Sequence, residues 1–237
     1  MTEEIVGPQR VATVRVDRDV NAAPRGRAAE LRQEWTRQGT LVVNVLSSPG
    51  AGKTSLLEST ARHWRGRHTM QVLVGDLATD RDAQRLAPWA PAVQLTTGGA
   101  CHLELPLVER GLRELPDEQC DFLFIENVGN LVCPASHDLG EHVRVLLLST
   151  TEGDDKPGKY PKAFRTSQML VISKTDLLPY VPFSVEAACE DARLIQPELE
   201  CVSVCARTGK GVSDWCEALE RRRERLLAER ETGPARL

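Results

Sequence analysis

The sequence predicts an α/β fold, with a mostly parallel sheet of about seven strands and helices on both faces. From residue 41 onward, short apolar runs alternate with stretches of helical periodicity, the pattern of parallel strands joined by right-handed crossover helices. Hydrophobic residues make up 41% of the chain and aromatic residues only 4%. The core must therefore consist mainly of Leu, Val, Ile and Ala, which favours a buried parallel sheet over an aromatic-rich β-sandwich.

The order of the elements follows from the apolar and helical patterns. Strands are expected at 41–47, 70–76, 92–97, 121–127, 143–150, 168–174 and 199–206. Helices are expected at 53–65, 80–89, 103–115, 184–196 and 211–230, with Thr79 or Asp80 capping the second of them. Residues 1–38 differ: they hold a possible short strand at 11–20 and a helix at 23–35. We expect residues 1–38 to form an extension that packs on a main domain at 39–237.

Charge and cysteine usage narrow the class of protein. The net charge of −4 argues against a dedicated nucleic-acid binder. No apolar run approaches the ~18 residues that a transmembrane helix needs, and the chain begins without the basic and apolar regions of a secretory signal. We therefore expect a cytoplasmic protein with no membrane partner, in which the seven cysteines are reduced. Most of these cysteines are expected to be small core residues.

A phosphate-binding loop follows the first strand of the main domain. SSPGAGKT fits the pattern G-x-x-x-x-G-K-S/T except that Ser47 replaces the first glycine, and it stands between a strand and a helix. Backbone N–H groups of such a loop and the helix N-terminus face phosphate oxygens, while the lysine adds a positive charge. The hydroxyl of Thr54 is a candidate ligand of Mg²⁺. This predicts the P-loop NTPase fold, with nucleotide contacts from Gly50, Ala51, Gly52, Lys53, Thr54 and Ser55.

A second motif indicates the base. VISKTDLL resembles the N-K-x-D element of GTP-binding proteins, with Ser173 in place of Asn. The carboxylate of Asp176 can accept hydrogen bonds from N1–H and the N2 amine of guanine but would reject adenine, and the Lys174 stem can lie along the base plane. The alternative is an Asp that caps a helix after a strand. The later Cys205-Ala206-Arg207 matches the third guanine element only weakly.

Acidic residues close two further strands. Asp76 ends the second strand and Glu126 the fourth, where ligands of parallel sheets collect. Both are candidate ligands of Mg²⁺ or of its water shell, together with Thr54. Gly129 follows Glu126 at D/E-x-x-G spacing and could donate its N–H to the γ-phosphate. We expect Lys53, Asp76 and Glu126 to be the catalytic residues.

Three soft or borderline ligands leave the same edge of the predicted sheet. Cys101 and His102 follow the third strand, and Cys133 stands seven residues beyond Glu126. Two thiolates and one imidazole suit Zn²⁺ or Ni²⁺, and three ligands leave a position open, as in a site that passes its metal on. The alternative is a buried Cys beside a His at a helix start. A disulfide between the two cysteines is not expected in a reducing compartment.

Six segments resemble the hydrogenase nickel incorporation GTPases, the HypB family of SIMIBI-type P-loop GTPases. They lie in the expected order over roughly residues 40–215 and read SSPGAGKTSLLE, GDLATDRDAQRL, GGACHLE, FIENVGNLVCPASHDLGEHVRV, LLSTTEGDDKPGKYPKAF and SKTDLLPYV. ENVGNLVCP and TEGDDKP are not general GTPase motifs, which makes the resemblance specific.

The resemblance implies GTP-dependent nickel delivery in the maturation of nickel–iron hydrogenase, with GTP/GDP, Mg²⁺ and Ni²⁺ or Zn²⁺ as ligands. It implies a homodimer promoted by GTP, with Cys101, His102 and Cys133 forming a metal site at or near the interface. Partners would be a nickel-supplying accessory protein and the hydrogenase large subunit precursor. It favours Lys159 over Lys156 as the lysine of a mobile loop at 152–161 that reaches the nucleotide. The apolar run at 177–183 is then a partner surface or a covered loop.

Several features depart from the family or favour other functions. Residues 1–40 hold no Cys and no His, so an N-terminal nickel store is not expected. His137 stands where an aromatic residue is expected, as a fourth ligand or a lid. A urease-type nickel accessory GTPase is the alternative within the class, although its Cys-Pro-His signature is missing. A metal-storage module without significant GTPase activity is the alternative outside it. Turnover is expected to be slow, because no Gln or Arg finger is evident.

Overall fold

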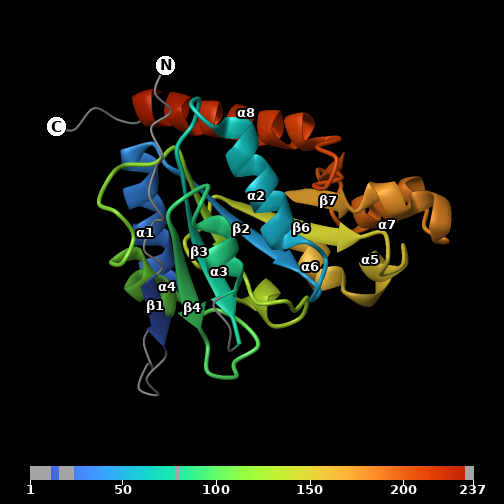
Figure 1. Cartoon of the computed structure of the whole chain (residues 1–237), viewed down its shortest axis with the longest axis horizontal. Helices are drawn as coiled ribbons and strands as arrows, with labels where there is room; N and C mark the ends of the chain where they lie inside the picture. The colour runs from blue at the N-terminus through green and yellow to red at the C-terminus, as the bar shows by residue number, and fades with distance from the viewer. Residues whose placement is uncertain (1–11, 16–23, 78–80, 233–237) are drawn as a thin grey trace.

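A parallel β-sheet runs through the centre of the protein (Figure 1). The computed structural model describes residues 12–15, 24–77 and 81–232, and within them eight strands pair in the order β1-β4-β3-β5-β2-β6-β7-β8, each pair parallel. The strands are β1 (Ala12–Arg15), β2 (Leu41–Ser47), β3 (Met70–Asp76), β4 (Ala92–Thr96), β5 (Phe122–Glu126), β6 (Val143–Ser149), β7 (Met169–Ser173) and β8 (Glu200–Ser203).

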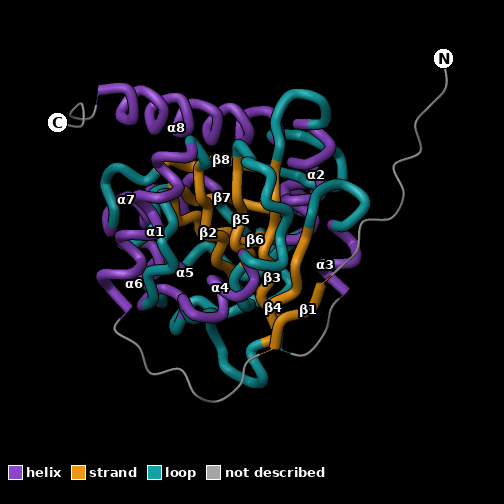
Figure 2. The backbone as a smooth tube through the Cα atoms, turned by 90° about the vertical axis from the view of Figure 1, so that its left-hand side faces the viewer, coloured by secondary structure: helices purple, strands orange, loops and turns teal. Residues whose placement is uncertain are grey.

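Helices cover both faces of the sheet, as Figure 2 shows. They are α1 (Pro24–Gln38), α2 (Lys53–Trp64), α3 (Arg81–Leu86), α4 (Leu105–Leu112), α5 (Lys156–Lys159), α6 (Pro161–Arg165), α7 (Val185–Ile195) and α8 (Val212–Thr232), with 3₁₀ turns η1 (Pro134–Ser136) and η2 (Thr175–Tyr180). Alternate residues of a strand point to opposite faces. Val43 and Val45 of β2 accordingly pack with α2, α3 and α8, whereas Val42 packs with α4 and Leu46 with α6 and α7.

The predicted fold class and all seven predicted strands are confirmed. The eighth strand, β1, comes from the N-terminal extension and pairs with β4 at the sheet edge. The predicted cap at Thr79 or Asp80 lies outside the described residues. The expected loop at 152–161 is wrong for 156–159, which form the single helical turn α5. There, Lys156 pairs with Glu152 and Lys159 with Asp155, four residues back in each case.

The strand order brings the predicted motifs to one edge. The connections run to either side of β2, and such a switch point is where ligands bind in open parallel sheets. Glu126, the last residue of β5, is level with Val45 of β2 and Val74 of β3. The loops that leave β2, β3 and β5 therefore begin side by side. No helix within the described part of the chain is long and apolar enough to span a membrane.

Candidate nucleotide and metal sites

The phosphate loop connects β2 to the N-terminus of α2. Gly50 and Gly52 take left-handed backbone conformations, with φ of 73° and 99°, which glycine adopts without strain. The side chain of Lys53 is buried and its Nζ donates to Ser47 Oγ at 3.0 Å. Ser47, the residue that departs from the motif, thus holds the lysine at the mouth of the loop. The loop presents a helix N-terminus and an ammonium group together, an arrangement that suits phosphate.

Glu126 faces the same loop from the end of β5. Its Oε1 accepts from Thr54 Oγ1 at 2.9 Å, while its buried Oε2 has no hydrogen-bond partner. Burial raises the pKa of Glu126 to about 7, against the lowering influence of Lys53 and Thr54. An orphaned carboxylate oxygen beside a hydroxyl fits a Mg²⁺ ion with retained waters, because a cation there would supply the missing partner.

The other two sensor candidates lie close by. Asp76 ends β3, and its Oδ1 accepts from the N–H of Leu77 at 2.6 Å. Gly129 presses on the phosphate loop: a Cβ on Gly129 would lie 2.8 Å from Pro49 Cα. A side chain larger than hydrogen would therefore displace the backbone of one of the two loops. The roles of Asp76, Glu126 and Gly129 toward a nucleotide stay predictions.

A cavity of about 330 Å³ lies beside the phosphate loop, between it and the ends of β7 and β8. It is lined by Ala51, Gly52, Ser55, Leu56, Ser173, Lys174, Asp176, Leu177, Val204, Cys205, Ala206 and Arg207. Ser173 Oγ donates to the carbonyl of Ala51 at 2.7 Å, which joins this motif to the phosphate loop. The position next to a phosphate loop and the volume suit a nucleotide base.

The carboxylate of Asp176 has two protein donors in this cavity. Cys205 Sγ donates to Oδ1 at 3.1 Å, and Arg207 donates to Oδ2 from Nη2 at 2.8 Å and from Nε at 3.1 Å. These bonds hold the pKa of Asp176 below its usual range, so the group is ionised. The weak sequence match at Cys205 and Arg207 therefore does reach the predicted base site, and a base must displace or share the arginine.

The structure brings Cys101, His102 and Cys133 together. Their ligand atoms all lie within 4.8 Å of one another, although the residues come from the loops after β4 and β5. Cys101 Sγ lies 3.8 Å from His102 Nδ1. The neighbouring Cys101 sulfur raises the pKa of the Cys133 thiol, and burial is the main cause that lowers the pKa of His102. A soft or borderline metal would replace the thiol protons and take the neutral imidazole, so the donor set fits the predicted cargo.

A buried polar network, which sequence reasoning missed, holds the two metal loops. Asn127 Oδ1 accepts from the N–H of Leu103 at 3.3 Å, and Asn127 Nδ2 donates to Asn44 Oδ1 at 3.3 Å. Asn44 and Asn127 are fully buried. Asn127 follows Glu126 and Leu103 follows His102, so one side chain ties the end of β5 to the histidine loop.

The network continues beneath the second cysteine. Asn44 Nδ2 donates to Glu141 Oε1 at 3.2 Å, and Arg144 Nε donates to the same oxygen at 2.9 Å. Arg144 also donates to the carbonyls of Ala135 at 3.2 Å and His137 at 2.8 Å, in the turn after Cys133. Asn44 and Arg144 each interrupt an apolar strand sequence, LVVNVLS and VRVLLLS, and that interruption is the signal that could have revealed the network.

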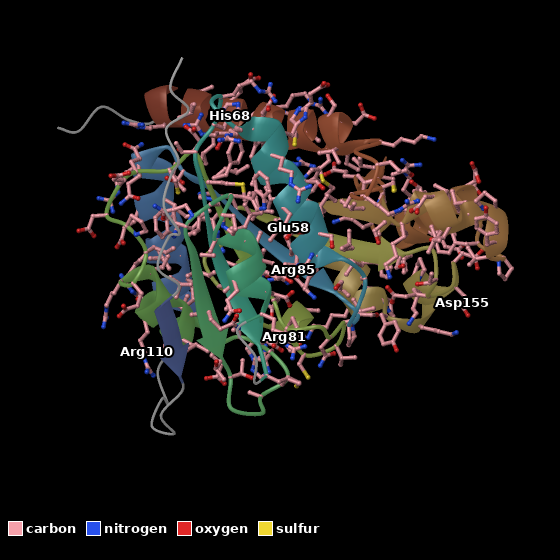
Figure 3. The ribbon with its side chains drawn as sticks, viewed as in Figure 1. Glu58, His68, Arg81, Arg85, Arg110 and Asp155 are labelled. Atoms are coloured by element: carbon pink, nitrogen blue, oxygen red, sulfur yellow. The ribbon has the colours of Figure 1, made fainter. Side chains whose placement is uncertain are left out.

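Two further charged groups, Lys159 and Arg85, are held by ion pairs. Lys159 is exposed, forms an ion pair with Asp155 and does not line the base cavity; Figure 3 shows Asp155 at the right-hand side of the molecule. Arg85 of α3 donates to Glu58 at 2.8 Å and to Ser55 at 3.1 Å on α2, and Figure 3 shows Arg85 beside Glu58. Arg85 therefore braces the helix that begins at the phosphate loop. The predicted contact of Lys159 with a nucleotide stays a prediction.

Comparison with known proteins agrees with this geometry. Residues 41–203 match the family described as "CobW/HypB/UreG, nucleotide-binding domain". The hydrogenase maturation factor HypB of Azotobacter vinelandii is 44% identical over 218 residues, which are 92% of this chain and 72% of that protein. The chain belongs to the HypB family of P-loop GTPases.

Two other HypB proteins extend the comparison. The hydrogenase/urease maturation factor HypB of Helicobacter hepaticus is 50% identical over 170 residues, which are 70% of this chain and 69% of that protein. The crystal structure of HypB from Helicobacter pylori in complex with nickel has a TM-score of 0.79 to this structure and 40% sequence identity, covering 84% of this chain and 94% of that one. These HypB proteins thus resemble the chain in sequence, and the Helicobacter pylori protein also shares its fold.

Proposed function

We propose that this HypB-family chain is a GTP-hydrolysing metallochaperone that binds nickel and assists its insertion during the maturation of nickel–iron hydrogenase. The observation that carries the proposal is one loop. Glu126 at its start is hydrogen-bonded to Thr54 of the phosphate loop, and Cys133 at its end belongs to the thiol–imidazole trio. A nucleotide sensor and a metal ligand on one short loop suit a protein whose nucleotide state controls its metal.

The nucleotide half of the proposal assigns a role to each group. Lys53 and the backbone of Gly50 and Gly52 hold the phosphates, and Asp176 selects guanine. A Mg²⁺ ion held by Thr54 and Glu126, with Asp76 through its water shell, would neutralise charge on the phosphates. Among the described residues near the phosphate loop, Arg85 is engaged by Glu58 and Ser55. The proposal keeps the slow turnover that the sequence predicts.

The metal half treats Ni²⁺ as cargo. Cys101, His102 and Cys133 hold it, and Zn²⁺ suits the same donors. GTP promotes a homodimer in which two trios approach across a two-fold axis, so that six ligands meet. The segment at 177–183, in which Pro179, Tyr180 and Pro182 are exposed and Tyr180 is 82% exposed, is the proposed dimer surface. A nickel-supplying accessory protein loads the site, and the hydrogenase large subunit precursor receives the metal.

The test is the affinity for nickel in two nucleotide states. Ni²⁺ and Zn²⁺ are titrated into the protein loaded with GDP and with a non-hydrolysable GTP analogue, and the two dissociation constants are compared. By linkage, a metal that binds one state more tightly also shifts the nucleotide affinity by the same factor. Cys133→Ala should lose the high-affinity metal, and Lys53→Ala should lose the difference between states. Equal affinities in both states of the wild type would contradict the coupling.

Two competing functions remain to be separated by experiment. The Helicobacter hepaticus relative is described as a hydrogenase/urease maturation factor, so a urease precursor is the second candidate acceptor. Mixing nickel-loaded protein with each acceptor precursor and measuring nickel transfer separates the two. A metal-storage module is the candidate outside the class, and it predicts no GTP turnover in the wild type above that of Lys53→Ala.

A further inference from the structure

The turn after Cys133 folds a second imidazole, that of His137, back onto His102 of the metal trio. Residues Pro134–Ser136 form the 3₁₀ turn η1, so His137 lies one turn beyond Cys133 at C-x-x-x-H spacing. His137 Nδ1 lies 3.0 Å from the carbonyl oxygen of Cys133. A carbonyl can only accept, so Nδ1 carries the proton and the lone pair of the neutral ring is on Nε2. Histidines that bind metals in proteins commonly donate their other ring N–H to a backbone carbonyl in this way.

The ring of His137 also touches a member of the trio directly. It stacks on the ring of His102, with centroids 3.9 Å apart and an interplanar angle of 17°. Nε2 of His102 is buried without a hydrogen-bond partner, and Glu104 Oε1 lies 3.6 Å away. Arg144 holds the turn in place through the carbonyls of Ala135 and His137. The imidazole of His137 is therefore held by its Nδ1 contact with the Cys133 carbonyl and by its stack on the imidazole of His102.

We propose that His137 is a fourth, exchangeable ligand of the metal site in this chain. This inference rests on the metal site of the proposed function. Two rings in parallel planes cannot aim both lone pairs at one ion, so coordination requires the ring of His137 to turn out of the stack on His102. With Cys101, His102 and Cys133 the set becomes two sulfurs and two nitrogens, which closes a tetrahedral site for Zn²⁺. When His137 returns to the stack, one coordination position opens.

Two variants separate the contribution of the His137 ligand nitrogen from that of ring stacking. His137→Phe keeps a flat ring that can stack on His102 but has no ligand atom, whereas His137→Ala removes both. Zn²⁺ affinity is measured for the wild type and both variants, with thermal unfolding of the metal-free proteins as the fold control. We expect binding about 10- to 100-fold weaker in both variants. Loss in His137→Ala with wild-type affinity in His137→Phe would assign the effect to stacking and overturn the proposal.

Spectroscopy counts the imidazole ligands around Zn²⁺, a number that would not change if His137 only packed beside the site. X-ray absorption of the Zn²⁺-loaded wild type should show two sulfurs near 2.3 Å and two imidazole nitrogens at about 2.0–2.1 Å, and one imidazole in His137→Phe. Long-range ¹H–¹⁵N NMR should show the Nε2 resonance of His137 shift on Zn²⁺ addition. One imidazole in both proteins overturns the inference while leaving the trio intact. Loss of Zn²⁺ binding in Cys133→Ala confirms that trio, and wild type that binds neither Zn²⁺ nor Ni²⁺ refutes the proposed function itself.

Discussion

At the scale of the residue, the carboxylate of Asp176 is the group that we expect to select guanine over other bases. Its carboxylate accepts from Cys205 and Arg207 at the wall of the base cavity. We expect Asp176→Asn to bind GDP about 100-fold more weakly, since it loses two charge-assisted bonds and turns an N–H₂ donor toward guanine donors. Asp176→Asn should gain affinity for xanthosine diphosphate, because the second carbonyl of xanthine can accept a hydrogen bond from the new amide N–H₂. Fluorescent-nucleotide titration measures both, with exposed Asp214→Asn as the control; unchanged GDP affinity would contradict the assignment.

His142 gives a prediction about acid stability. Its Nδ1 accepts from the N–H of Val42 at 3.0 Å, and its Nε2 lies 3.1 Å from Thr36 Oγ1, a fully bonded neutral ring. Burial lowers the pKa of His142 from 6.5 to about 4, so between these values the unfolded state binds more protons and stability falls as pH falls. Between pH 7 and pH 5 this amounts to about 2 kcal/mol.

The measurement is urea unfolding at both pH values. His142→Gln can retain an acceptor for Val42 but does not titrate, so the difference in unfolding free energy between wild type and variant should shift by about 2 kcal/mol in favour of the variant at pH 5. The subtraction cancels the other titrating groups. A difference that is independent of pH would show that His142 does not titrate on unfolding as described.

At the scale of the element, the loop from β5 to η1 depends on one buried amide. Asn127→Ala leaves the N–H of Leu103 without its acceptor and Asn44 without a donor. We expect about 2–4 kcal/mol of destabilisation in urea unfolding, because two buried groups are left unpaired and each costs about 1–3 kcal/mol. Asn130→Ala, on the same loop and partly exposed, should cost below about 1 kcal/mol. Equal losses in the two variants would show that the network is not the cause.

Strands and the phosphate loop could be predicted because their signals are local. The apolar run of β2 and the glycine-rich turn after it specify their own structure, and the pairing of Cys101 with Cys133 followed from both loops leaving the same sheet edge. Arg144 beneath the turn of His137 could not be predicted, because it joins segments through contacts that no spacing encodes. The helical turn α5 was missed because Gly158 and Pro157 suggest a loop, whereas Pro157 is buried and stands in the first turn of the helix, where proline is tolerated. The boundary at residue 38 stays a prediction.

At the scale of the whole molecule, the segment at 177–183, which exposes Tyr180, permits a test of the proposed dimer. Tyr180 is 82% exposed and Leu194 on α7 is 83% exposed, so the two are matched large apolar side chains at different places on the surface. We expect Tyr180→Glu to weaken GTP-promoted dimerisation by at least about 10-fold, because it desolvates a charge in the interface. Sedimentation velocity with a GTP analogue measures the effect. Leu194→Glu should dimerise as wild type does. Equal dimerisation affinities of the two variants would show that Tyr180 is not part of the interface.

The loop from Glu126 to Cys133 has a mechanical consequence. It is seven residues long, so its contour is about 24 Å at most, and it is pinned within that length by the bond of Asn127 to Asn44 and by the contact of Gly129 with Pro49. A chain so short and so firmly held has no slack in which to absorb a movement at one end. We expect the loop to transmit a movement at its nucleotide end directly to Cys133. The lifetime of the bound nucleotide would then set the lifetime of the bound metal.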